Sequence, residues 1–259
     1  MRSVLLSLAL LAPVPAAGEW AVTAAEFTEP TTRYGHGVLG DAVEFGAMRV
    51  SVTDAAGKRG RAHTDIVLPV SRVFEDLAPR IADLDGDAVP EIIVVETDIA
   101  QGASLAVYNA YGLVARTPFL GQTHRWLAPV GAADLDGDGR VEIAYVETPH
   151  LGRTLKLVRL EGDRLVPVAE LAGLTNHRIG DAFIQGGIAD CGDGPVIVTA
   201  DADWSNIMAT RFNGRTLTTE AVAPYSGPES LTRARGCRCP VRAPASRCRA
   251  GKSLRASRW

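Results

Sequence analysis

The chain has 259 residues, of which 46% are hydrophobic and 22% are charged, and its formal net charge is −3. This hydrophobic content is ordinary for a globular protein with a packed core, and the length allows one β-rich domain or two small ones. Beyond the N-terminal region, no stretch is long and apolar enough for a membrane anchor, because a spanning helix needs about 20 apolar residues. The small net charge hides an uneven distribution, since nine of the 27 Lys and Arg residues lie between 233 and 259, where no acid occurs.

The first 18 residues have the features of a secretory signal peptide. Met1 and Arg2 give a basic start, Val4–Ala12 form a short apolar run, and small residues follow up to Gly18. This order is typical of a cleavable leader. We therefore expect residues 1–18 to be removed near 16–18 and the protein to be secreted or periplasmic. A buried N-terminal strand or helix is the alternative interpretation.

Three segments repeat one pattern, in which a short apolar stretch enters an acidic turn and a β-branched stretch leaves it. They cover residues 80–96, 131–147 and 187–200, and a fainter fourth copy covers 34–52. Two further strand-like stretches follow each acidic turn, joined by turn signals such as Asn213-Gly214. Asn-Gly between alternating stretches is a strong hairpin signal. Each unit is thus expected to hold four short strands.

Four strands per unit at a period of about 40–50 residues are the signature of a propeller blade. The sequence therefore predicts an all-β fold, a β-propeller of about four four-stranded blades within residues 19–228. Propellers generally have roughly four to eight blades, so an incomplete or truncated propeller stays open, as does an ordinary β-sandwich. The expected blades cover about residues 30–75, 76–125, 126–180 and 181–228.

Two acidic turns, 83–91 and 134–142, carry carboxylates at loop positions 1, 3, 5 and 9. Calcium prefers six to eight oxygen ligands at about 2.3–2.6 Å, and carboxylates this close together repel one another without a cation. We expect Ca²⁺ in each loop, with the backbone carbonyl at position 7 as a further ligand. A pair of Asp-Gly turns without metal is the alternative. The expected ligands are Asp83, Asp85, Asp87, Val89 and Glu91 in the first loop, and Asp134, Asp136, Asp138, Arg140 and Glu142 in the second.

These two loops, each followed by an apolar strand, resemble the calcium loops of FG-GAP/VCBS-type repeats found in integrin-α-like β-propellers. The resemblance covers roughly residues 75–222 and implies a propeller whose loops bind calcium. Glu91 and Glu142 replace the last Asp of the family pattern, and Ala88 stands where the second loop keeps Gly139. We expect Ala88 to strain the first loop. The third copy, at 190–193, has lost the alternation of acids, so we expect no metal there.

No catalytic residue is predicted. The five histidines are scattered along the sequence, and His124 and His177 precede successive acidic turns at equivalent places, which favours a role in repeat packing. Trp126 and Trp204, with two tyrosines, allow an aromatic sugar-binding patch but are more typical of blade cores. No Gly-x-Ser-x-Gly motif or phosphate loop occurs.

The last segment, 229–259, is basic and rich in Arg and Cys, and we expect it to be disordered. The whole sequence favours an exported binding or scaffold module stabilised by structural calcium. Its partner is expected to be a protein or a carbohydrate, with no nucleic acid and no transmembrane segment. A carbohydrate-active propeller enzyme, either a lyase or a hydrolase, and a truncated, non-functional propeller are the alternatives.

Overall fold

The computed structural model describes residues 20–54 and 60–236, so the predicted signal peptide and most of the basic tail lie outside the described residues. The described residues form seventeen strands and one short helix. All strand pairs are antiparallel. This confirms the predicted all-β fold. None of the described helical residues form a segment long and apolar enough to cross a membrane.

The first sheet contains eight strands in the order β1-β2-β4-β6-β7-β8, with β3 paired to β2 and β5 paired to β6. It joins the two segments that the sequence assigns to separate blades, because the short strand β4 pairs with both β2 and β6. The strands are β1 (Trp20–Thr31), β2 (Glu44–Asp54), β3 (Arg61–Val67), β4 (Arg72–Phe74), β5 (Arg80–Ala82), β6 (Glu91–Asp98), β7 (Gly102–Asn109) and β8 (Gly112–Arg116).

The second sheet has the order β12-β11-β10-β9, and the third has the order β13-β15-β16-β17 with β14 paired to β15. The second sheet consists of β9 (Leu127–Ala133), β10 (Glu142–Glu147), β11 (Thr154–Glu161) and β12 (Arg164–Ala172). The third consists of β13 (Leu174–Thr175), β14 (Gly187–Asp190), β15 (Pro195–Asp201), β16 (Asn206–Phe212) and β17 (Leu217–Pro224).

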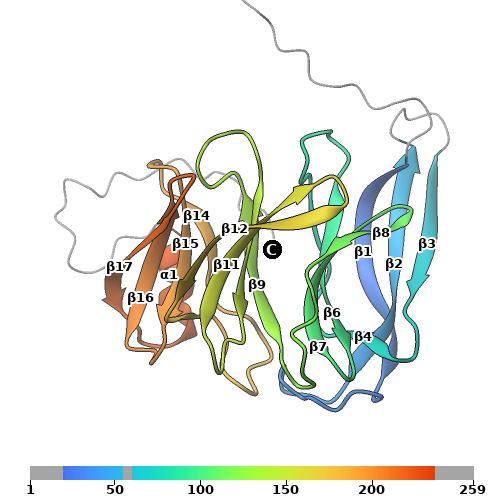
Figure 1. Ribbon diagram of the computed structural model, residues 1–259, viewed down its shortest axis with the longest axis horizontal. Coiled ribbons are helices and arrows are strands. Elements are labelled where there is room, and N and C mark those ends of the chain that lie inside the picture. The colour runs from blue at the N-terminus through green and yellow to red at the C-terminus, as the bar shows by residue number, and fades with distance from the viewer. Residues whose placement is uncertain (1–19, 55–59, 237–259) are drawn as a thin grey trace, which may run out of the picture.

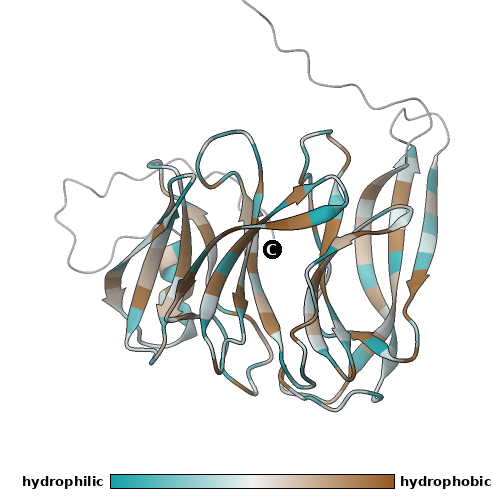
Figure 2. Cartoon of the chain, viewed as in Figure 1, coloured by the Kyte–Doolittle hydropathy of each residue, from teal (hydrophilic) through white to brown (hydrophobic). Residues whose placement is uncertain are grey.

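The sheets stand side by side in a row, and their facing sides form the cores (Figure 1). Strand β6 is buried along its whole length. Because successive side chains of a strand point to opposite faces, Ile93 and Val95 pack into the core shared with the second sheet, whereas Ile92 and Val94 pack against β2. This explains the unbroken apolar run after the first acidic turn, which lies among the apolar parts of the strands in Figure 2.

The row of sheets does not close into a barrel, and this arrangement is consistent with an incomplete propeller-like fold (Figure 1). The strands at the two ends of the row are largely exposed. In β3, six of the seven residues are exposed, and most residues of β17 are exposed as well. Exposed charged residues and a proline, Arg61 and Asp65 in β3 and Glu220 and Pro224 in β17, limit the pairing of these edges with other chains.

The start of the basic tail is ordered, in contrast to the disorder expected from residue 229. Residues 228–235 form α1 (Pro228–Arg235), which begins with a proline in its first turn, where the missing N–H costs no hydrogen bond. Leu231 is fully buried against β15 and β16, and the guanidinium of Arg235 donates to the carbonyl of Gly186 (2.6 Å). Basic composition alone missed this docking because it rests on a few specific contacts of Leu231 and Arg235.

Candidate metal sites

The first acidic loop joins β5 to β6 and is held by its own carboxylates. One Asp83 oxygen accepts the backbone N–H of Gly86 (2.8 Å), and the other accepts that of Ala88 (3.0 Å). Gly86 has φ of +82°, a conformation that glycine adopts without strain. Ala88 has φ of +68°, which is unfavourable for a residue with a Cβ. The strain expected at Ala88 is therefore present in the backbone.

The second loop joins β9 to β10 and repeats this geometry. Asp134 accepts the backbone N–H groups of Gly137 (2.8 Å) and Gly139 (2.9 Å). Gly139 has φ of +87°, so it occupies without strain the conformation that Ala88 adopts in the first loop. The two loops are thus near copies in backbone conformation.

Each loop brings three carboxylates together at its centre. One oxygen from each member lies within 4.8 Å of the others, and the groups are Asp83, Asp85 and Glu91, and Asp134, Asp136 and Glu142. The remaining acid of each loop makes a local contact, because Asp87 accepts the N–H of Val89 (2.7 Å) and Asp138 accepts that of Arg140 (2.9 Å). The roles of Asp87 and Asp138, and of the carbonyls of Val89 and Arg140, stay predictions.

The glutamates at position 9 lie at the buried end of each loop. Glu91 accepts the N–H of Leu84 (2.9 Å), and Glu142 accepts that of Leu135 (2.8 Å). Burial, reinforced by the nearby charges of the loop aspartates, raises the pKa of Glu91 to about 7. Burial also raises the pKa of Glu142, although Arg159 opposes that shift. A cation beside these carboxylates would offset the repulsion between their negative charges and favour their ionised forms.

The loops differ in their neighbours across the sheet. Arg159 of β11 forms ion pairs with Asp136 (3.1 Å) and Asp138 (3.0 Å) of the second loop. Its Nε also donates a hydrogen bond to the fully buried carboxylate of Glu142. In the part of the chain that the structure describes, no acid of the first loop takes part in an ion pair.

The donor sets decide how well each loop fits a metal ion. Three convergent carboxylates and no protein cation are a donor set suited to a hard cation such as calcium, and this describes the first loop. The second loop has the same oxygens, but the Arg159 guanidinium contacts two of the three. Asp136 also lies close to the next sheet, since a Cβ added at Gly214 would be 3.0 Å from its carboxylate.

Four of the five histidines, which are far apart in the sequence, lie near one another in the fold. The rings of His36 and His124 stack at 5.0 Å, and those of His150 and His177 lie 5.1 Å apart. Trp126 contacts the second pair, and its indole N–H donates to the carbonyl of Glu75 (2.9 Å). His124 and His177 thus contribute to packing between repeats, as their equivalent positions indicate.

The buried carboxylate of Glu75 joins the other histidine pair. It contacts the Nδ1 of His36 (2.5 Å) and accepts the hydroxyl hydrogen of Thr97 (2.6 Å). Tyr34 is also buried here, and its hydroxyl accepts the N–H of His124. Tyr34 and His36 lie in the fainter copy at 34–52, but the repeat pattern did not predict this grouping because it does not specify which side chains of different copies meet.

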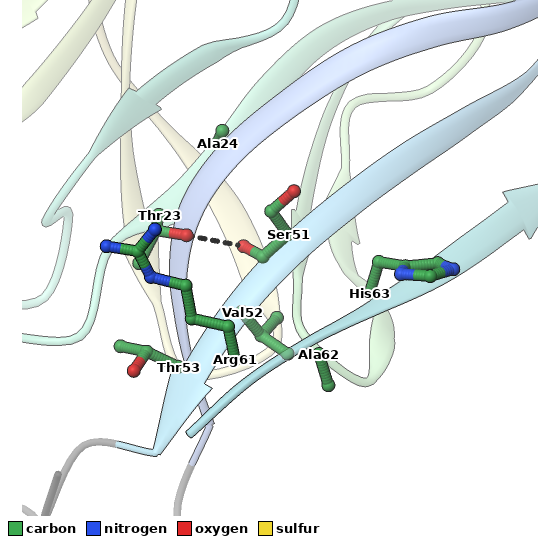
Figure 3. Close-up of a pocket in the computed structure, with 8 residues that line it drawn as sticks. All are labelled: Thr23, Ala24, Ser51, Val52, Thr53, Arg61, Ala62 and His63. Atoms are coloured by element: carbon green, nitrogen blue, oxygen red, sulfur yellow. Dashed lines mark hydrogen bonds between the residues drawn. The ribbon is translucent and has the colours of Figure 1, made fainter.

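Two surface hollows lie away from the acidic loops. The larger, of about 590 Å³, is lined by residues of β1, β2 and β3, among them Thr23, Ser51 and His63 (Figure 3). The other, of about 430 Å³, contains Trp204 and Tyr225, with the Arg178 guanidinium 4.6 Å from the Trp204 ring centroid. Trp126 is buried between sheets, which agrees with the blade-core role that the sequence favours, so it does not join Trp204 in the alternative sugar-binding patch.

Comparison with known families gives a match between residues 83–145 and the FG-GAP-like repeat. The matched segment begins at Asp83 and contains both acidic loops. Residues 83–145 therefore match an FG-GAP-like repeat, which supports a β-propeller repeat module and confirms the resemblance drawn from the sequence. Comparison with curated proteins gives no match.

Proposed function

We propose that this protein is an exported, calcium-stabilised β-propeller repeat module that binds or scaffolds a partner. The observation that carries the proposal is the convergence of Asp83, Asp85 and Glu91 within the matched repeat, together with the equivalent group in the second loop. A bound calcium ion would neutralise these carboxylates and tie each turn to the strand that follows. Its role is structural, because the loops connect strands within the packed sheets.

Thermal melting of the mature chain during a calcium titration tests this proposal. A ligand that binds only the folded state raises the melting temperature as its concentration increases. We expect a rise with calcium, reversal by EGTA and a smaller rise with magnesium, which demands a more rigid octahedral geometry. An unchanged melting temperature in millimolar calcium would contradict the proposal.

Export is supported by the leader-like residues 1–18, which lie outside the described residues. The expected localisation is secreted or periplasmic. N-terminal sequencing of the protein isolated from its natural host should show a start close to residues 17–19. A protein that retains Met1 after export-competent expression would contradict this part of the proposal.

An enzyme is the second candidate function, and the grouping of Tyr34, His36 and Glu75 favours it. A histidine held by a buried carboxylate is an arrangement used in general acid–base catalysis, and the His36 side chain is 17% exposed. Incubation with polysaccharides, followed by detection of new chain ends, tests a lyase or hydrolase. Activity that His36→Ala abolishes, while the fold is retained, would establish this function over the scaffold role.

A further inference from the structure

The second acidic loop receives a positive charge from the neighbouring strand. In the antiparallel pair of β10 and β11, Arg159 lies directly opposite Glu142. Side chains at such positions lie on the same face of the sheet, close enough for direct contact. The Arg159 side chain is 11% exposed and contacts the carboxylates of Asp136, Asp138 and Glu142. Three of the four acids of this loop therefore have a guanidinium partner.

The first loop has a neutral residue at the corresponding position. Ile92 of β6 pairs with Tyr108 of β7, so one further step in the register places Asn109 opposite Glu91. The Asn109 carboxamide oxygen accepts the N–H of Tyr111 (2.8 Å) and thereby belongs to the β7–β8 turn. Strand β7 therefore supplies no positively charged side chain to balance the acids of the first loop.

We infer that Arg159 is a built-in counter-cation of the second loop, and that it makes calcium binding there at least tenfold weaker than in the first loop. This inference rests on the proposed calcium function. Calcium entering the second loop must displace the guanidinium or bind next to it. A unit positive charge about 4 Å from a cation is strongly unfavourable even near a protein surface.

As a consequence, calcium binds to the two loops in two steps. The first loop fills at low calcium concentration, while Arg159 keeps the second loop folded without a metal. At higher concentration, calcium competes with Arg159 for Asp136 and Glu142. Because Asp136 lies beside the Gly214 turn of the third sheet, the second step changes the charge at a contact between two sheets.

Isothermal calorimetry on the full chain tests the inference. Asp85→Ala silences the first loop, and in this background the calcium affinity of the second loop is measured with Arg159 and with Arg159→Gln. We expect Arg159→Gln to tighten binding by about tenfold or more. Arg159→Lys is the matched control, since it retains the charge and should keep binding weak. Circular dichroism melting verifies that each variant is folded.

Transfer of the charge gives a second test that leaves Arg159 in place. Asn109→Arg should weaken calcium binding to the first loop by about tenfold, whereas Asn109→Gln, which loses the same turn contact without adding charge, should not. This pair remains informative if Arg159→Gln does not fold.

The outcomes separate the inference from the function on which it rests. Two sites of equal affinity, unaffected by Arg159→Gln and by Asn109→Arg, would overturn the role of Arg159 while leaving calcium binding intact. The absence of calcium binding in the wild type and in every variant would overturn the proposed function itself.

Discussion

The two acidic loops share six of nine residues and a similar backbone conformation, but their charges are neutralised differently. In the second loop, Arg159 contacts three carboxylates, and in the first the equivalent position holds Asn109. The residues that shape each turn lie within nine positions of one another. The residue that balances its charge lies on the next strand. The conformation of each loop is therefore determined by residues close together in the sequence. Its affinity for a cation depends instead on which residue of the neighbouring strand lies opposite the loop glutamate.

The largest expected contrast concerns metal-free stability. Glu142→Ala removes the buried acceptor of the Arg159 Nε–H, while Asp136 and Asp138 keep their contacts with the guanidinium. The variant should destabilise the metal-free fold by about 3 kcal/mol, because a buried charged donor loses its hydrogen bond. Glu91→Ala removes one of several repelling carboxylates and should cost less than half of that value. Urea unfolding in EGTA measures both. Equal losses would show that Arg159 does not stabilise the second loop.

Removal of an aspartate from each loop should affect calcium stabilisation unequally. At a calcium concentration about 100-fold above the dissociation constant, one site contributes about 2.7 kcal/mol. At moderate calcium, Asp85→Ala should abolish most of the rise in melting temperature. Asp136→Ala should remove only the weaker binding event. Calorimetric melting across a calcium series distinguishes the two variants, and the reverse order would contradict the assignment of the tighter site.

Backbone strain provides a smaller, opposite pair of effects. Ala88→Gly should stabilise the first loop by about 1 kcal/mol, because glycine adopts a positive φ without a Cβ clash. Gly139→Ala should destabilise the second loop by a similar amount for the same reason. Nothing lies within 4 Å of a Cβ added at Gly139, so the loss of stability in Gly139→Ala reports on backbone strain and not on a steric clash. Chemical denaturation in EGTA gives the comparison, and matching signs for the two variants would refute it.

The smallest effect is expected at the third turn. Asp190 accepts the N–H of Gly192 (2.8 Å), and the groups of three convergent ligands found among residues 20–54 and 60–236 come from the first two loops. Asp193→Ala should therefore leave calcium stoichiometry and affinity unchanged. Calorimetry on this variant also serves as the control for the two loop variants. Loss of a binding event would show that the third repeat retains a metal site.

The sequence predicted those features that depend on residues close together in the chain. These include the all-β fold, the two acidic turns and the strain at Ala88. It did not predict that β4 joins two expected blades into one sheet, because three residues are too few to show a periodic pattern. Arg159 was also missed as a partner of the loop acids. Its role depends on which residue of β11 faces Glu142, and only the folded hairpin determines that pairing.

The histidine grouping was missed for a related reason. His36 lies in the faint copy at 34–52, yet its ring stacks on that of His124, which lies 88 positions further along the chain. Sequence distance gives no measure of such proximity when repeats stack face to face. The equivalent positions of His124 and His177 were informative because both belong to the repeated unit.

Helix α1 makes the third sheet different from the other two. Along β15, Ile197 points toward the second sheet, while Val196 and Val198 point to the opposite face, where Leu231 covers them. In a closed ring of blades that face would receive another sheet. In the part of the chain that the structure describes, α1 packs on this face of the third sheet instead. Val196 and Val198, the apolar residues of that face, are thereby withdrawn from solvent.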